Sequence, residues 1–241
     1  MTLPRVDSTN NFLKKELAKS APLPEGTVIM AEEQYAGRGQ GSNSWISEPG
    51  KNLTFSILLQ PGFLPLQNQF MLNKALSLAI YDALLPLTGC ALKIKWPNDI
   101  YFNDDKLGGM LIENIIRGNE WKYAVAGIGI NVNQVFFTGP IQKVTSIVKI
   151  LHTEYNLKRL LRELCKTVQS RYLQLKAGEY KVLDSEYLQC LYRLNEKHLY
   201  YINGQTVDGT IKNIDENGRL QVLLEEGLRS FGLKEIAYVI P

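Results

Sequence analysis

EQYAGRGQGSNSW, at residues 33–45, is the most informative stretch of this chain. It sets three glycines around one arginine and ends on a tryptophan: Gly37, Gly39, Gly41, Arg38 and Trp45. Glycines let backbone amides approach a bound anion closely and adopt positive φ, and an arginine adds a permanently charged, forked donor. Because glycine is also the default residue of surface turns, the neighbouring segments must distinguish a plain turn from an anion-binding loop.

Four further motifs flank that segment in order. DSTN at residues 7–10 precedes it, and KWPND at 95–99, KLGG at 106–109 and GIGIN at 127–131 follow it. No single motif is specific, but together and in this order they resemble the biotin protein ligases, enzymes that attach biotin to a lysine of a carboxylase. The motifs are dense from Val6 to Leu175, and the resemblance continues more loosely to Pro241.

The composition is typical of a globular, enzyme-sized protein. Of 241 residues, 45% are hydrophobic and 21% charged, and the formal net charge of +3 is too small to indicate a nucleic-acid-binding protein. Cys90, Cys165 and Cys190 are far apart and odd in number, which argues against a disulfide framework and a zinc site. The N-terminus lacks a signal-peptide pattern, and no uninterrupted apolar run approaches the roughly 18 residues that span a bilayer. We therefore expect a cytoplasmic protein with no membrane partner.

Periodicity predicts the elements that carry the motifs. Helices are expected over residues 9–19, 72–84, 144–151 and 157–176, and strands over 27–32, 53–59, 91–95, 106–114 and 123–130. The motifs fall at the ends of strands, where loops present functional groups from a rigid support. The resemblance implies an α/β (α+β) fold with a mixed central sheet and flanking helices, of the biotin/lipoate ligase type that is like class II aminoacyl-tRNA synthetases.

The pattern changes near Asp184. A short helix to about Asn195 leads into five brief strands separated by Asn203-Gly204, Asn217-Gly218 and Glu226-Gly227, which are typical hairpin turns. These strands predict a small SH3-like barrel, which the resemblance also implies. We expect a catalytic domain over residues 1–184 and a C-terminal barrel domain with its leading helix over 185–241. Because the chain begins almost at DSTN, we expect no DNA-binding module and no nucleic-acid partner.

The chemistry implied by the resemblance needs positive charge. Biotin is activated with ATP to biotinyl-5′-AMP, with Mg²⁺ as the accompanying ion, and the acyl group then passes to a lysine. The biotin carboxylate and the α-phosphate are both anions, so the site needs fixed cations where they meet. Arg38 and Lys106 match the family positions for this role and are the predicted catalytic residues. Without the flanking Leu107-Gly108-Gly109, a solvated lysine at a strand end would be the better interpretation of Lys106.

The resemblance also implies binding residues. Those expected to contact biotin are Ser8, Thr9, Gln34, Gly37, Arg38, Lys106, Gly127 and Gly129. Those expected to contact ATP or the adenylate are Arg38, Gly39, Gln40, Trp45, Asn98, Asp99, Lys106 and Asn131. Gly127 and Gly129 are expected to leave room for the valeryl chain of biotin, and Asp99 either to orient Lys106 or to hold Mg²⁺. Ser8 as a plain helix cap and Trp45 as a core residue remain alternatives, and we interpret Trp96 and Pro97 as structural.

The glycine-rich loop departs from the family pattern GRGRxGRxW. This chain has Gln40, Gly41, Ser42, Asn43 and Ser44 where basic residues are common. The lost charge predicts weaker retention of the adenylate, unless Lys51 swings in to replace it.

Three functions compete. The first is a biotin ligase that modifies the biotin carboxyl carrier domain of a carboxylase. The second is a lipoate ligase or octanoyltransferase, which shares the fold but not this combination of motifs, and the third is a non-catalytic biotin or nucleotide sensor. The anion-handling residues favour an enzyme, and GRG followed by tryptophan favours biotin. The sequence leaves open which carboxylase is modified and whether the protein is a monomer or a homodimer.

Overall fold

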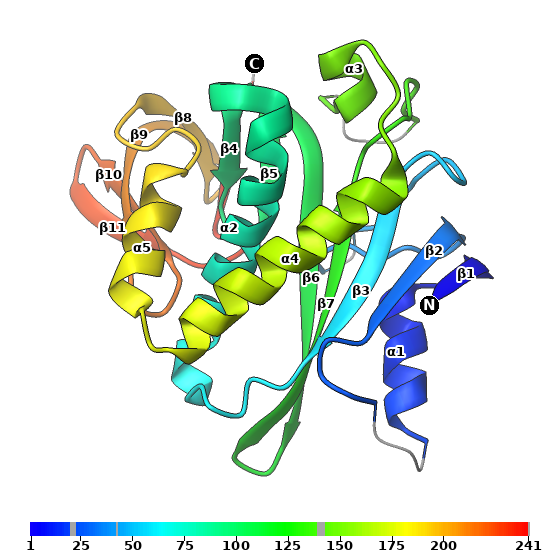
Figure 1. Cartoon of the computed structure of the whole chain (residues 1–241). Coiled ribbons are helices and arrows are strands. Elements are labelled where there is room, and N and C mark those ends of the chain that lie inside the picture. The colour runs from blue at the N-terminus through cyan, green and yellow to red at the C-terminus, as the bar shows by residue number, and fades with distance from the viewer. Residues whose placement is uncertain (20–22, 42, 139–142, 241) are drawn as a thin grey trace.

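The computed structural model describes residues 1–19, 23–41, 43–138 and 143–240. Its centre is a seven-stranded mixed sheet with the order β1-β2-β3-β7-β6-β5-β4 (Figure 1). Only β1 and β2 are parallel. The strands are β1 Thr2–Val6, β2 Val28–Gln34, β3 Leu53–Leu59, β4 Leu92–Lys95, β5 Asp99–Phe102, β6 Asp105–Arg117 and β7 Glu120–Ile130. The predicted mixed central sheet is therefore confirmed, although β1 and β5 were not expected.

Helices cover both faces of this sheet. On one face lies α2 (Gln69–Thr88), against which α4 (Leu157–Lys176) and α5 (Tyr180–Gln189) pack, while α1 (Thr9–Leu17) packs on the other face. Alternation along β3 explains the two layers, because Leu58 belongs to the α1 side and Ile57 and Leu59 to the α2 side. A short helix, α3 (Ile147–Leu151), is less extensive than the helix expected from residue 144.

The apolar helix α2 is a core element. Residues Leu66–Ala91, which include α2, are long and apolar enough to cross a membrane, but 56% of the most apolar window is buried inside the structure. Leu72, Leu76 and Leu84 are fully buried. Because α2 packs between the central sheet and α4, its apolar character is that of a buried helix.

A second sheet follows at the β4 end of the first (Figure 1). Its five antiparallel strands run in the order β11-β10-β9-β8-β12. They are β8 Lys197–Ile202, β9 Gln205–Ile214, β10 Leu220–Leu224, β11 Gly227–Phe231 and β12 Ile236–Tyr238. The predicted Asn203-Gly204 hairpin turn is confirmed, with φ of 49° and 83° at its two residues.

The two sheets share one hydrophobic core. Buried residues of both belong to a single cluster, and the indole Nε1 of Trp96 donates to the carbonyl of Gly218 at 2.9 Å. Trp96 is 5% exposed, which fits its structural interpretation, although it also lines the cavity described below. The helix expected from Asp184 instead begins at Tyr180, and α5 therefore runs across residue 184.

Candidate active site

A cavity of about 690 Å³ gathers the predicted site residues. It lies between the α1-side face of the central sheet, the glycine-rich loop and β12 of the second sheet. Its lining includes thirteen of the fourteen predicted residues: Ser8, Thr9, Gln34, Arg38, Gly39, Gln40, Trp45, Asn98, Asp99, Lys106, Gly127, Gly129 and Asn131. The fourteenth, Gly37, lies where a Cβ would approach the carbonyl oxygen of Trp45 to 2.3 Å, so it lets the loop fold back on itself.

The floor of the cavity is built on glycines of β7. A Cβ added to Gly127 would lie 2.4 Å from Asn10 Oδ1, and one added to Gly129 would lie 2.5 Å from Trp45 Cε2. These distances are far below van der Waals contact. In this structure the space that we expected for a valeryl chain is therefore filled by Asn10 and Trp45.

A polar network lies beside the glycine floor, at the start of α1. Gln34 Oε1 accepts hydrogen bonds from the backbone N–H and the hydroxyl of Thr9, at 2.8 and 3.0 Å. Ser56 Oγ, which is fully buried, lies 2.7 Å from Thr9 Oγ1 and 2.5 Å from Asn10 Oδ1. The network holds several donors and acceptors ready for a small polar ligand. Its member Ser56 was missed, although a serine within the apolar run LTFSILL was a usable signal.

The side chain of Ser8 does not cap α1. Ser8 occupies the N-cap position, but its side chain makes no capping hydrogen bond. It is 3% exposed and lines the cavity. The interpretation of Ser8 as a plain helix cap is wrong, because its side chain makes no capping hydrogen bond.

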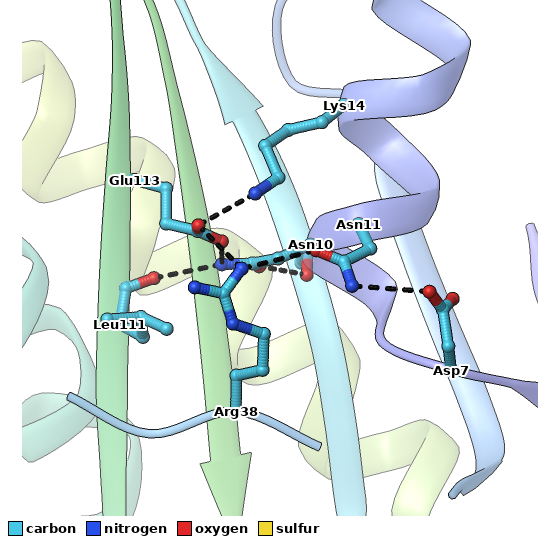
Figure 2. Close-up of polar contacts among 8 residues, drawn as sticks. Asp7, Asn10, Asn11, Lys14, Arg38, Leu111 and Glu113 are labelled. Carbon is cyan, nitrogen blue, oxygen red and sulfur yellow. Dashed lines mark hydrogen bonds and ion pairs between the residues drawn. The ribbon is translucent and has the colours of Figure 1, made fainter. Parts of the chain in front are cut away.

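Arg38 is held by a carboxylate in this structure (Figure 2). Its Nη1 lies 3.0 Å from Glu113 Oε1 on β6 and 3.3 Å from Asn11 Oδ1 on α1. Glu113 also accepts from Lys14 at 2.7 Å and from Asn10 at 2.9 Å. Burial alone would raise the pKa of Glu113, but the hydrogen bonds from Lys14 and Asn10 and the charges of Lys14 and Arg38 outweigh it and lower that pKa.

The partnership of Arg38 has a consequence for ligand binding. A phosphate or carboxylate that binds Arg38 competes with Glu113 for the guanidinium. Glu113 was not foreseen, because its side chain reaches the cluster only through the pairing of β6 in the central sheet.

Lys106 and Asp99 form an ion pair over a third glycine. Lys106 Nζ lies 2.7 Å from Asp99 Oδ1, and a Cβ on Gly109 would meet that same oxygen at 2.7 Å. The geometry fits the expectation that Asp99 orients Lys106. Among the described residues there is no group of three or more His, Cys, Asp or Glu side chains that could hold a metal ion. Asp99 alone does not make a resident magnesium site.

A second lysine of the cavity was missed by sequence reasoning. Lys95 Nζ lies 4.6 Å from the ring centre of Tyr238 on β12 and 5.1 Å from that of Tyr101 on β5. Burial lowers the pKa of Lys95, with Lys106 lowering it further and Asp99 opposing the change. The motif KWPND contained Lys95, but nothing local in the sequence indicated that its neighbour would be a tyrosine of the second sheet.

Two predicted asparagines brace the backbone around the cavity. Asn98 is buried and donates to the carbonyl of Met110 at 2.6 Å, and Asn131 is buried and donates to the carbonyl of Thr145 at 3.1 Å. Each side-chain amide thus spends one N–H on the protein, and its second N–H and its carbonyl oxygen are the groups that a ligand could engage.

The glycine-rich loop folds back on itself at the edge of the cavity. The N–H of Gly39 donates to the carbonyl of Asn43 at 2.8 Å, and the N–H of Asn43 donates to the carbonyl of Gln40 at 3.2 Å. Trp45 Nε1 is buried and has no hydrogen-bond partner among the described residues. Ser42 lies outside those residues.

Lys51 does not line the cavity. Its Nζ lies 3.2 Å from Glu154 Oε1, beyond α3 in the chain. In this structure Lys51 therefore does not stand in for a cation at Gln40.

Comparison with known proteins identifies the family. A family model described as the biotin/lipoate A/B protein ligase family matches residues 2–131, more than half of the chain. The chain belongs to this family. The match covers the segment from β1 to the end of GIGIN, which supplies most of the lining of the cavity.

Individual members of the biotin/lipoate ligase family resemble the chain to different extents. The bifunctional ligase/repressor BirA of Bacillus spizizenii is 39% identical over 129 residues, which are 54% of this chain and 39% of that protein. The biotin--[acetyl-CoA-carboxylase] ligase of Mycobacterium tuberculosis is 27% identical over 219 residues, 88% of this chain and 79% of that protein. The chain thus spans about two fifths of the length of the first relative.

A solved structure matches the whole chain. The biotin protein ligase from Aquifex aeolicus in complex with biotin and ATP superposes with a TM-score of 0.83 at 27% identity, covering 100% of this chain and 98% of that one. Both sheets of the present structure are included in that match. The fold that was expected from the sequence, that of the biotin protein ligases, is therefore confirmed.

Proposed function

We propose that this protein is a biotin protein ligase that activates biotin with ATP and transfers it to a lysine of a biotin carboxyl carrier domain. The observation that carries the proposal is the full-length match to a ligase whose structure holds biotin and ATP. The cavity supports it, because thirteen of the fourteen predicted biotin and nucleotide residues line it.

The charges of the cavity suit a reaction between two anions. Arg38, Lys95, Lys106 and Lys234 line it, against a single carboxylate, Asp99. Two unit charges about 4 Å apart repel by about 4 kcal/mol at an effective dielectric constant of about 20. Fixed cations offset that repulsion as the carboxylate oxygen attacks the α-phosphorus and pyrophosphate leaves. The lysine amine of the acceptor then attacks the acyl carbon, and AMP leaves.

Each group of residues has a proposed role. The hydroxyls of Ser8 and Thr9 and the Gln34 amide hold the polar head of biotin. Lys106, oriented by Asp99, stabilises charge at the reacting phosphate. The remaining proposed contacts to biotin are Gly37, Arg38, Gly127 and Gly129, and those to the nucleotide are Arg38, Gly39, Gln40, Trp45, Asn98 and Asn131. Contact of biotin with Gly127 and Gly129 requires the side chains of Asn10 and Trp45 to move, because they fill that space in this structure.

The metal ion, the roles of the two sheets, the cellular location and the partner also belong to the proposed function. Mg²⁺ enters with the ATP phosphates as part of the substrate, since the described lining of the cavity offers it one carboxylate, Asp99, which is already paired with Lys106. We assign catalysis to residues 1–184 and a supporting role to residues 185–241, with α5 crossing the boundary. We place the protein in the cytoplasm, with a carboxylase as its macromolecular partner and neither DNA nor a membrane among its ligands.

One assay separates the proposal from its competitors. The purified protein is incubated with ATP, Mg²⁺ and either biotin or lipoate, and pyrophosphate is measured before and after an apo carrier domain is added. Biotin-dependent pyrophosphate followed by carrier biotinylation is expected. Activity with lipoate alone would indicate a lipoate ligase, and biotin binding without pyrophosphate would indicate a sensor.

A further inference from the structure

The turn between β11 and β12 reaches the glycine-rich loop. Leu233 and Lys234 of this turn line the cavity together with Gln40. A Cβ added to Gly41 would lie 3.1 Å from Lys234 Nζ and 3.2 Å from Lys234 Cε. The ammonium group of the second sheet therefore lies directly against the loop, although the two segments are far apart in the chain.

The backbone of this turn is clamped. The carboxylate oxygen Oε2 of Glu235 accepts from the N–H of Gly232 at 2.6 Å and from Arg219 at 2.8 Å. Lys234 itself has φ of +68°, in the left-handed region that a lysine seldom adopts. These hydrogen bonds fix the backbone position from which the Lys234 side chain extends. The neighbouring carboxylate, Glu235, is already paired with Arg219.

Two of the other cations that line the cavity have carboxylate partners, Arg38 with Glu113 and Lys106 with Asp99. The third, Lys95, lies against the rings of Tyr101 and Tyr238. Over the described parts of the chain, no ion pair involves Lys234. The residue beside Gly41, Gln40, is neutral. Lys234 can thus meet an anion at this edge of the cavity without displacing a carboxylate of the described residues.

We propose that Lys234 is the phosphate contact that the second sheet contributes to the adenylate site. Its ammonium binds the phosphate of the bound nucleotide across Gly41 and holds the glycine-rich loop against it. This assignment rests on the proposed function for the identity of the anion. It gives the second sheet a direct part in retaining the reactive intermediate, in addition to its packing on the central sheet.

The first test is equilibrium binding of AMP and of adenosine to the full chain. Lys234→Met is compared with wild type and with Lys212→Met, a control at an exposed lysine on β9 whose amine contacts Asn195. A charge-assisted contact predicts that Lys234→Met lowers AMP affinity about tenfold or more and leaves adenosine affinity unchanged. Lys234→Arg should retain most of the AMP affinity, and Lys212→Met all of it. Urea unfolding of each variant shows that the fold is kept.

The second test times the release of preformed biotinyl-adenylate. Lys234→Met is expected to release it about tenfold faster than wild type, with biotin affinity in the absence of nucleotide unchanged. A folded Lys234→Met protein with wild-type AMP affinity overturns the assignment. A wild-type protein that binds AMP through Lys234 but forms no biotinyl-adenylate overturns the proposed function and leaves the phosphate contact standing.

Discussion

Two glycines on one strand offer a matched pair of substitutions with different expected costs. Gly127→Ala and Gly129→Ala add the same methyl group to β7, two residues apart and therefore on the same face. The first methyl would meet the Asn10 side chain at 2.4 Å, and the second would meet the Trp45 ring at 2.5 Å. In each case the neighbouring side chain must move by about 1 Å to reach ordinary contact.

The cost at Gly127 should appear in stability. Asn10 is 3% exposed, donates to Glu113 and to the carbonyl of Leu111, and lies 2.5 Å from Ser56 Oγ. Displacing it breaks or strains these hydrogen bonds, each contributing about 0.5–1.5 kcal/mol. Together with overpacking, we expect Gly127→Ala to lower the free energy of unfolding by about 2–4 kcal/mol. Biotin binding should weaken too, because Ser56 also contacts Thr9.

The cost at Gly129 should appear in ligand retention. Trp45 is partly exposed and sits on a loop, so its ring can swing away from β7 with a change in stability of about 1 kcal/mol or less. A displaced ring no longer covers the cavity. Since an aromatic contact contributes about 0.5–1.5 kcal/mol beyond its buried area, release of the adenylate should accelerate by up to about tenfold.

Urea unfolding and the rate of adenylate release, measured on both variants, distinguish the two effects. Gly127→Ala should shift the unfolding midpoint, and Gly129→Ala should mainly change the release rate. If Gly129→Ala destabilises the protein as much as Gly127→Ala does, Trp45 is a core residue and its assignment to the cavity cover is wrong. If Gly127→Ala unfolds at the wild-type urea concentration, the network around Asn10 does not stabilise the fold.

Four other outcomes are expected. Lys106→Ala should slow adenylate formation by about a hundredfold while biotin affinity stays within about tenfold, because its charge acts at the reacting phosphate; equal losses in both would refute this division. Glu113→Gln should reduce the loss of stability between pH 7 and pH 3 in denaturant titrations. The folded-state pKa of Glu113 is lowered from 4.5, so its pairs stabilise the fold above that pH and are lost as pH falls through the lowered pKa. Lys51→Ala should leave the adenylate release rate unchanged, since Lys51 pairs with Glu154; faster release would mean that it reaches the phosphate when ligand is bound. Removing the residues after Leu194 should abolish carrier biotinylation and lower the unfolding midpoint, because the second sheet shares the core; a fully active truncated protein would show that sheet to be dispensable.

The sequence predicted the elements whose signals are local. The apolar run of β3 and the helical period of α4 gave the observed bounds, Leu53–Leu59 and Leu157–Lys176. The residue pairs that end in glycine and mark the hairpin turns of the second sheet are equally local signals. By contrast β5 is four residues long and begins at the last residue of the motif KWPND, so periodicity had too few residues to reveal it.

The site was predictable as a set of residues but not as a set of contacts. The motifs indicated which side chains meet, and the cavity brings them together. The partners of Arg38 and Lys95 come from β6 and β12, and they follow from strand pairing and sheet packing. Ser56 is a comparable case, because its contact with Asn10 crosses 46 positions of sequence.

The contacts suggest two ends of the cavity with different readiness for ligand. At the end proposed for biotin, Thr9 is hydrogen-bonded to Gln34 and to Ser56, so a polar ligand can join a network whose geometry is set before binding. At the end proposed for the nucleotide, Arg38 pairs with Glu113, which Lys14 also contacts, and Lys106 pairs with Asp99. A polyanion that binds there must compete with two carboxylates, and part of its attraction to these cations is offset by the pairs that it breaks. Lys95 and Lys234 carry no such pair among the described residues. An anion can therefore meet Lys234 without displacing a carboxylate, and Lys95 likewise, although burial lowers the pKa of Lys95. Both depend on the second sheet, because Lys95 packs against Tyr238 of β12 and Lys234 lies in the turn that reaches the glycine-rich loop.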